Sequence, residues 1–236
     1  LWSESTERSA RLVRLLLSEG KGMRSSIADY HRIFWLGGPP DYEPGPELSM
    51  EAIGRGEGKS AEAAAYDCLL ERDGKALLYS PLFNYLEGHY DIARDMMLHP
   101  NSILGISDGG AHCGMICDAS APTYLLAHWA RDRKRGPLVG LEQAVKMQTH
   151  DTAILYVFED RGLIQAGLRA DLNLIDFDNI NLPSPELVND LPANGQRYIQ
   201  RATGYHTTMV AGEITFQEGQ SSGALPGKLI RGPQNR

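Results

Sequence analysis

The 236-residue chain has a formal net charge of −7, 42% hydrophobic residues and 22% charged residues, which is typical of a globular protein with a substantial core. The acidic balance argues against a nucleic-acid partner, which calls for a basic face, and no stretch approaches the roughly 18 apolar residues of a membrane span. Three cysteines without a dense framework indicate a reducing compartment, so we expect a cytoplasmic protein. No signal peptide is visible, but the chain begins with Leu1 rather than Met, and we expect the true N-terminus to be missing.

Strands and helices alternate along the first two thirds of the chain. The helices are predicted from the spacing of apolar residues, from N-caps at Ser49 and Ser60, and from Pro122 in a first turn. They cover residues 6–18, 61–72, 90–98, 123–133 and 140–150, and short apolar runs predict strands at 33–36, 76–79 and 103–107. This alternation is typical of βα units around a parallel sheet. A closed eight-stranded barrel takes about 250 residues, so this segment would be a part of one.

From about residue 170 the pattern changes to short alternating strands. Residues 171–176 predict a half-buried strand, and residues 207–210 and 214–216 flank Ala211-Gly212-Glu213 as a hairpin. Further turn signals follow at Glu218-Gly219 and Pro226-Gly227. We therefore expect a small antiparallel β unit after the α/β part.

The strand predicted at 103–107 runs into Asp108, Gly109, Gly110 and His112. A strand end holds a charged group on a rigid support, and enzymes built on parallel sheets keep their chemistry there. Asp108 is therefore a candidate metal ligand or proton-transfer group, and the alternative is an aspartate that caps a turn before a helix. His112 could orient or polarise a substrate, or it could form an ordinary hydrogen bond in its loop.

Asn84 and Tyr85 follow the strand at 76–79 on the same expected edge as Asp108, so both are candidate substrate contacts. Cys113 and Cys117 lack a second pair at zinc-finger spacing, so we expect small buried side chains. The basic run at 131–135 is expected to be a solvated helix end. Four other histidines are expected to have structural roles: His31, His99, His128 and His150.

Three segments carry a family resemblance. The first is Gly105-Ile106-Ser107-Asp108-Gly109-Gly110 after His99-Pro100, the second is residues 148–153 followed by 160–172, and the third is residues 209–213 with 223–227. In these segments the chain resembles the amidohydrolase superfamily, and most closely its D-aminoacylase group, the N-acyl-D-amino-acid deacylases. The first segment is similar to the eighth barrel strand, the second to the junction between barrel and small β-sandwich, and the third to the last hairpin.

The resemblance implies an α/β fold class: the C-terminal part of a (β/α)8 TIM barrel over residues 1–165, then strands of a small β-sandwich over residues 166–236. It also implies one or two zinc ions, most of whose ligands would lie upstream of Leu1. Only the eighth-strand aspartate carries over, onto Asp108, as a metal ligand and as the carboxylate that takes a proton from zinc-bound water and hands it to the leaving amine. Residues 109–120 would shape the substrate mouth. His112 is followed there by Cys113-Gly114, which departs from the family pattern and leaves the substrate open.

The predicted function is therefore metal-dependent hydrolysis of a non-peptide amide C–N bond, that of N-acyl-D-amino acids, by the full-length parent. This chain alone is expected to be inactive. The alternatives are a cyclic amide hydrolase of the hydantoinase kind, and a truncated, non-catalytic barrel half that acts as a binding or scaffold protein. The expected partner is a small-molecule amide substrate, without nucleic acid or membrane. Because half a barrel exposes strand edges and an apolar interior, we expect the chain to need its N-terminal half or another chain.

Overall fold

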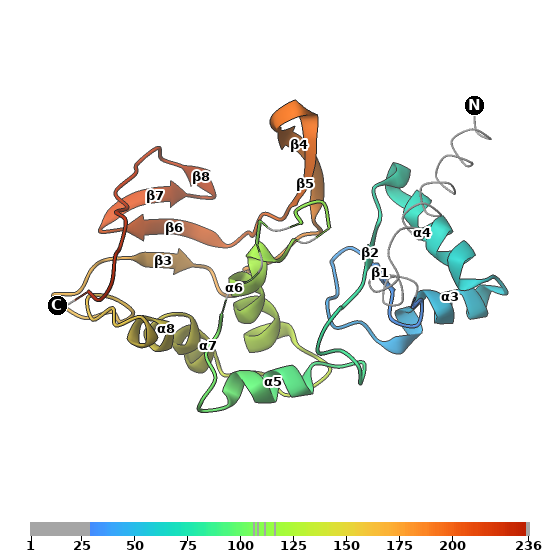
Figure 1. Ribbon diagram of the computed structural model, residues 1–236, viewed down its shortest axis with the longest axis horizontal. Coiled ribbons are helices and arrows are strands. Elements are labelled where there is room, and N and C mark those ends of the chain that lie inside the picture. The colour runs from blue at the N-terminus through green and yellow to red at the C-terminus, as the bar shows by residue number, and fades with distance from the viewer. Residues whose placement is uncertain (1–28, 106, 108, 111, 116, 235–236) are drawn as a thin grey trace. The chain divides into compact units, whose positions relative to one another are not determined.

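The computed structural model describes residues 29–105, 107, 109–110, 112–115 and 117–234, and these form a mixed α/β structure (Figure 1). The chain divides into two compact units, Leu1–Tyr90 and Asp91–Arg236. The expected boundary near residue 165 stays a prediction, and the helix expected at 6–18 lies outside the described residues. Within the described part of the chain, no helix is long and apolar enough to span a membrane.

The first unit contains two short strands separated by helices. Its elements are β1 (Phe34–Leu36), the 3-10 helix η1 (Pro46–Leu48), α3 (Met50–Glu57), α4 (Ala61–Gly74) and β2 (Leu77–Tyr79). Both predicted N-caps are confirmed, because the hydroxyls of Ser49 and Ser60 accept hydrogen bonds from backbone N–H groups in the first turns of α3 and α4. Buried side chains of α3 and α4 pack with Ile33 into a small core.

The parallel pairing predicted for these strands is wrong. β1 and β2 pair antiparallel, with Phe34 opposite Tyr79 and Leu36 opposite Leu77. A single helix between two strands carries the chain back to its starting edge and makes the pair parallel. Here α3 and α4 pack against each other, and the second helix reverses the chain once more. The order of apolar segments in the sequence did not reveal this additional reversal.

The second unit begins with helices. They are α5 (Asp91–Leu98), the 3-10 helix η2 (Asp118–Ser120), α6 (Ala121–Tyr124), the π-helix η3 (Leu125–Asp132), α7 (Leu141–Gln148) and α8 (His150–Leu155). The helices predicted near 90–98, 123–133 and 140–150 are confirmed, and Pro122 lies in the first turn of α6. Buried side chains of η3 and α7 form the core of this region with Val139.

The strand predicted at 103–107 is not formed by its described residues. Residues 102–105 and 107 make no β pairing, and Ile103 is 39% exposed. An apolar run becomes a strand only where a neighbouring backbone completes the hydrogen-bond ladder. The strands in the described part of the chain pair with one another elsewhere.

The basic run at the end of η3 is not the solvated helix end that we expected. The side chain of Arg133 is 0% exposed and its guanidinium donates to the Asp91 carboxylate at 2.6 Å. It also lies 4.8 Å from the centre of the Trp129 ring. Arg131 donates to backbone carbonyls of the segment 177–180, far along the chain. Partners so distant in sequence cannot be read from the local charge pattern.

The C-terminal part is antiparallel β structure, as predicted. Its elements are β3 (Leu172–Ile175), β4 (Glu186–Leu191), the 3-10 helix η4 (Pro192–Asn194), β5 (Gly195–Ile199), β6 (Tyr205–Val210), β7 (Glu213–Gln217) and β8 (Gln220–Ser221). One sheet has the order β3-β6-β7-β8, and β6 and β7 form the expected hairpin around Gly212. β4 and β5 form a separate hairpin that we did not predict (Figure 1).

The segment 160–172 forms a charged junction in front of β3. The Asp171 carboxylate pairs with Arg169 at 2.8 Å and with Arg161 at 3.4 Å. It also accepts a hydrogen bond from the Ala211 N–H at 2.8 Å, so it connects the junction to the β6–β7 turn. Ion pairs among charged side chains of the segment 160–172, which carries part of the family resemblance, therefore hold this segment in place.

Candidate active site

The candidate site begins at the turn after residue 105. Asp108, the predicted catalytic and metal-binding residue, lies outside the described residues. A side chain at Gly109 would approach the Cβ of Ala119 to 2.9 Å, so only glycine allows the turn to pack this closely on η2. Gly110 has φ of +95°, a conformation that favours glycine. Both glycines are thus required by the turn.

His112 lies in this turn region with its side chain exposed. Its backbone has φ of 46°, and its carbonyl accepts a hydrogen bond from the Met115 N–H at 2.7 Å. A left-handed histidine is uncommon and is held by a local turn of this kind. The backbone turn therefore fixes the point from which the exposed imidazole side chain extends. A contact between this imidazole and a substrate stays a prediction.

The two cysteines of the same region are free and half-buried. Burial raises the pKa of the Cys117 thiol, and the Asp118 carboxylate raises it further. A thiol with a raised pKa is protonated near neutral pH and is a poor nucleophile. The small buried side chains expected here are thus only half-buried.

A metal centre is not present among the described residues. No group of three or more His, Cys, Asp or Glu side chains in that part of the chain is arranged to hold a metal ion. A zinc site needs at least three protein donors. The described residues therefore do not fit a zinc centre by themselves, and a metal site would need donors from outside this part of the chain.

Tyr85 and Asn84 lie in the first unit, in the loop that follows β2. Tyr85 is 2% exposed, and its ring centre lies 6.0 Å from that of Phe34 in an edge-to-face contact. Its hydroxyl donates to the Pro44 carbonyl at 2.6 Å. Tyr85 thus anchors the loop from inside, and its contact with substrate stays a prediction. Asn84 is exposed, with φ of 59°, and it keeps its predicted role as a candidate contact.

Glu43 is a buried carboxylate that sequence reasoning missed. Its side chain is nearly inaccessible and accepts a hydrogen bond from the Tyr90 N–H at 2.9 Å. The hydroxyls of Tyr79 and Tyr90 lie 2.7 Å apart. Nothing in the surrounding Pro- and Gly-rich sequence signals a buried acid, because the partner that satisfies it is 47 residues away. Together with Tyr85, these contacts close both ends of the loop after β2.

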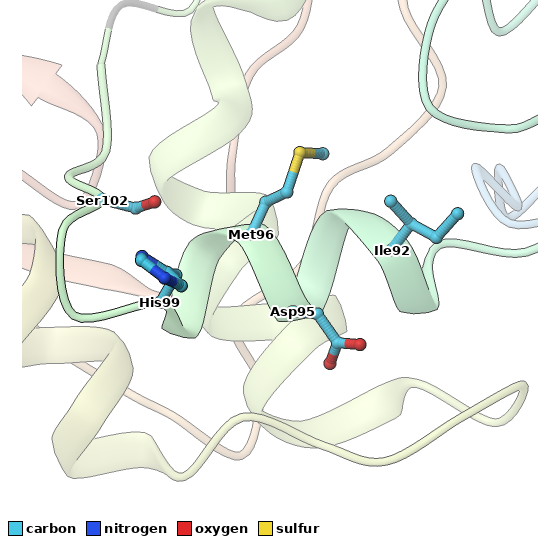
Figure 2. A pocket seen from close by; sticks show the side chains of 5 residues that line it. All are labelled: Ile92, Asp95, Met96, His99 and Ser102. Atoms are coloured by element: carbon cyan, nitrogen blue, oxygen red, sulfur yellow. The ribbon is translucent and has the colours of Figure 1, made fainter.

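One shallow pocket of about 320 Å³ lies along α5 and the turn that follows it (Figure 2). It is lined by Ile92, Asp95, Met96, His99 and Ser102. The Asp95 carboxylate points away from the His99 ring in Figure 2, so the two do not form an acid–base pair. His99 Nδ1 instead accepts a hydrogen bond from the Asn101 N–H at 3.2 Å, which fits the structural role predicted for it.

Comparisons with known proteins give related matches. A family model described as the amidohydrolase family matches residues 81–216, more than half of the chain. A D-aminoacylase of Alcaligenes xylosoxydans xylosoxydans is 30% identical over 193 residues, which are 80% of this chain and 35% of that protein. A crystal structure of D-aminoacylase, said to define a novel subset of amidohydrolases, is 24% identical with a TM-score of 0.42, covering 82% of this chain and 36% of that one. The chain thus spans about a third of the length of these relatives.

Proposed function

The chain belongs to the amidohydrolase family, and we propose that it takes part, within the complete protein, in hydrolysis of the amide C–N bond of an N-acyl-D-amino acid. The observation that carries this proposal is the family match over residues 81–216, because that stretch includes Asp108 and the glycine turn behind it. The 30% identity to a D-aminoacylase supports the choice of substrate class.

Asp108 is the proposed proton-transfer residue. Water attacks the amide carbonyl carbon while the Asp108 carboxylate takes one of its protons. The same carboxyl then gives that proton to the amide nitrogen as the C–N bond breaks, which releases a carboxylic acid and an amine. The exposed His112 is the proposed substrate contact on the same loop, and Asn84 and Tyr85 are proposed contacts from the loop after β2.

We propose further that the complete enzyme uses one or two zinc ions, whose role is to polarise the amide and activate water. Asp108 would be the ligand from this chain, and the remaining donors would come from outside it. This agrees with the share of the D-aminoacylase that the chain matches, 35% of its length.

The proposed architecture of the complete protein is a (β/α)8 barrel with a small β-sandwich, completed by the N-terminal half or by another chain. The match to 35% of the length of the D-aminoacylase supports this completion.

The test is a hydrolysis assay of the complete protein with a panel of N-acetyl-D-amino acids and with hydantoin, before and after Asp108→Asn. The variant is expected to lose at least about a hundredfold in kcat, the usual contribution of a positioned acid–base group. The matched control is Asp73→Asn, an exposed aspartate at the end of α4, which should keep its turnover. Turnover of hydantoin alone would favour the cyclic amide hydrolase, and unchanged turnover in Asp108→Asn would reject the proton-transfer role. Metal analysis of the same preparation tests the zinc proposal.

A further inference from the structure

The β4–β5 hairpin contacts the segment that follows Asp108. We call residues 109–110, 112–115 and 117–120 the site loop. The Tyr198 N–H of β5 donates to the Cys113 carbonyl of the site loop at 2.8 Å. The site loop lies between α5 and α6 in the chain (Figure 1), and the hydrogen bond places its Cys113 against β5. Eighty-five positions separate Cys113 from Tyr198 in the sequence, so the contact is a tertiary one.

Gln200 makes the second connection, at the base of the hairpin. Its side-chain oxygen accepts a hydrogen bond from the Ser120 hydroxyl at 2.5 Å, and its side-chain nitrogen donates to the Pro183 carbonyl at 2.7 Å. Pro183 precedes β4 and Gln200 follows β5, so a single amide closes the base of the hairpin. The same amide fixes Ser120, the last residue of the site loop and the residue before α6.

One further contact continues this connection. The hydroxyls of Thr123 in α6 and Tyr205 in β6 lie 2.8 Å apart. Burial raises the pKa of the Tyr198 phenol, with a smaller contribution from the neighbouring Cys117 thiol. The phenol is therefore partly buried. The site loop is thus held at Cys113 and at Ser120.

We propose that the β4–β5 hairpin is the positioning element of the site loop, with Gln200 as its principal side chain. Functional loops work when a rigid element sets their position, and the described loop residues 112–115 and 117–120 form neither strand nor α-helix of their own. Gln200 acts through Ser120, and the Tyr198 N–H acts through Cys113, next to His112. The consequence for catalysis rests on the proposed function, whereas the positioning itself does not.

The loop position is tested with the thiols of the chain as reporters. Cys113 and Cys117 lie in the site loop, and the buried Cys68 lies in the other unit as an internal reference. Gln200→Leu removes both side-chain hydrogen bonds and is expected to raise maleimide labelling of the two loop thiols relative to Cys68, about fivefold for each hydrogen bond lost. Labelling is read by peptide mass spectrometry.

Two companion variants make this result specific. Gln200→Glu keeps an acceptor for the Ser120 hydroxyl and is expected to restore part of the protection, whereas Gln217→Leu, an exposed position on β7, should match the wild type. If Gln200→Leu exposes Cys68 or loses the circular dichroism of the wild type, the protein has unfolded, and Ser120→Ala then decides in its place. Unchanged relative labelling in the deciding variant overturns the proposal.

The catalytic consequence is measured separately on the complete protein. Gln200→Leu is expected to lower kcat for N-acetyl-D-amino acids by about a hundredfold, as a misplaced group does, and Gln200→Glu should recover part of it. If labelling rises while kcat is unchanged, the hairpin positions the loop but does not serve the reaction. If the wild type hydrolyses no substrate of the panel, the proposed function fails, and the labelling result still decides the positioning.

Discussion

Arg133 offers a sharp test of the packing in the second unit. Its side chain has no exposed surface, and its guanidinium donates to the Asp91 carboxylate at 2.6 Å and to the Pro137 carbonyl at 3.0 Å. The same group lies over the Trp129 ring. Replacement by methionine keeps most of the length and apolar volume of the side chain but removes the charge and every donor.

The expected loss of stability follows from these contacts. The hydrogen bond from a charged donor is worth about 1.5 kcal/mol, the cation–π contact about 1 kcal/mol, and the pair with Asp91 about 0.5 kcal/mol, because that carboxylate is 45% exposed. Relief of the buried guanidinium's desolvation opposes these terms and lowers their sum. Arg133→Met should therefore lower the free energy of unfolding by about 2 kcal/mol, which is a Tm lower by about 6 °C for a chain of this size.

The assay is thermal and urea unfolding followed by circular dichroism, with Lys134→Met as the matched control. Lys134 is the exposed neighbour in sequence, and its replacement should change stability by less than about 0.5 kcal/mol. Equal stability of the two variants would refute the reasoning. It would mean that the desolvation cost of the buried guanidinium cancels its contacts, as happens in some buried ion pairs.

Two further predictions concern charges in the C-terminal part. Asp171→Asn should weaken the pair with Arg169 and the acceptor for the Ala211 N–H, lowering Tm by a few degrees and speeding amide exchange at Ala211, as measured by hydrogen–deuterium exchange. The hydrogen bond to the Glu218 carboxylate raises the pKa of His206. Because the folded pKa is the higher one, the pair stabilises the fold below the unfolded value of about 6.5, and this contribution disappears as pH rises through the folded value. An NMR titration should show a raised pKa for His206 that Glu218→Gln returns toward normal, and an unshifted pKa in the wild type would contradict the pair.

Local chemistry in the sequence predicted many of the elements. Ser60 before an apolar-periodic run predicted α4, and its hydroxyl does cap that helix. Ala211-Gly212 between two apolar runs predicted the β6–β7 hairpin, whose register the structure confirms. Such features depend on residues a few positions apart, and the single sequence contains all of the information they need.

The features that were missed or wrong depend on distant partners. The antiparallel pairing of β1 and β2 follows from the number of chain reversals between them, and the burial of Arg133 follows from Asp91, which is 42 residues away. The β4–β5 hairpin is an exception, because Asn194-Gly195 at its turn is a recognised hairpin signal that could have revealed it.

The candidate site shows the same division between local and distant information. The turn after Asp108 could be predicted from Gly109 and Gly110, since their chemistry is local. The hydrogen bond that supports the following loop could not be predicted, because Gln200 and Ser120 are 80 positions apart in the sequence. Sequence reasoning therefore identified a candidate catalytic carboxylate but not the hairpin that holds the neighbouring loop. Substitutions in residues 183–200 should consequently affect turnover without any contact with substrate, and a survey of function confined to the glycine turn would overlook them.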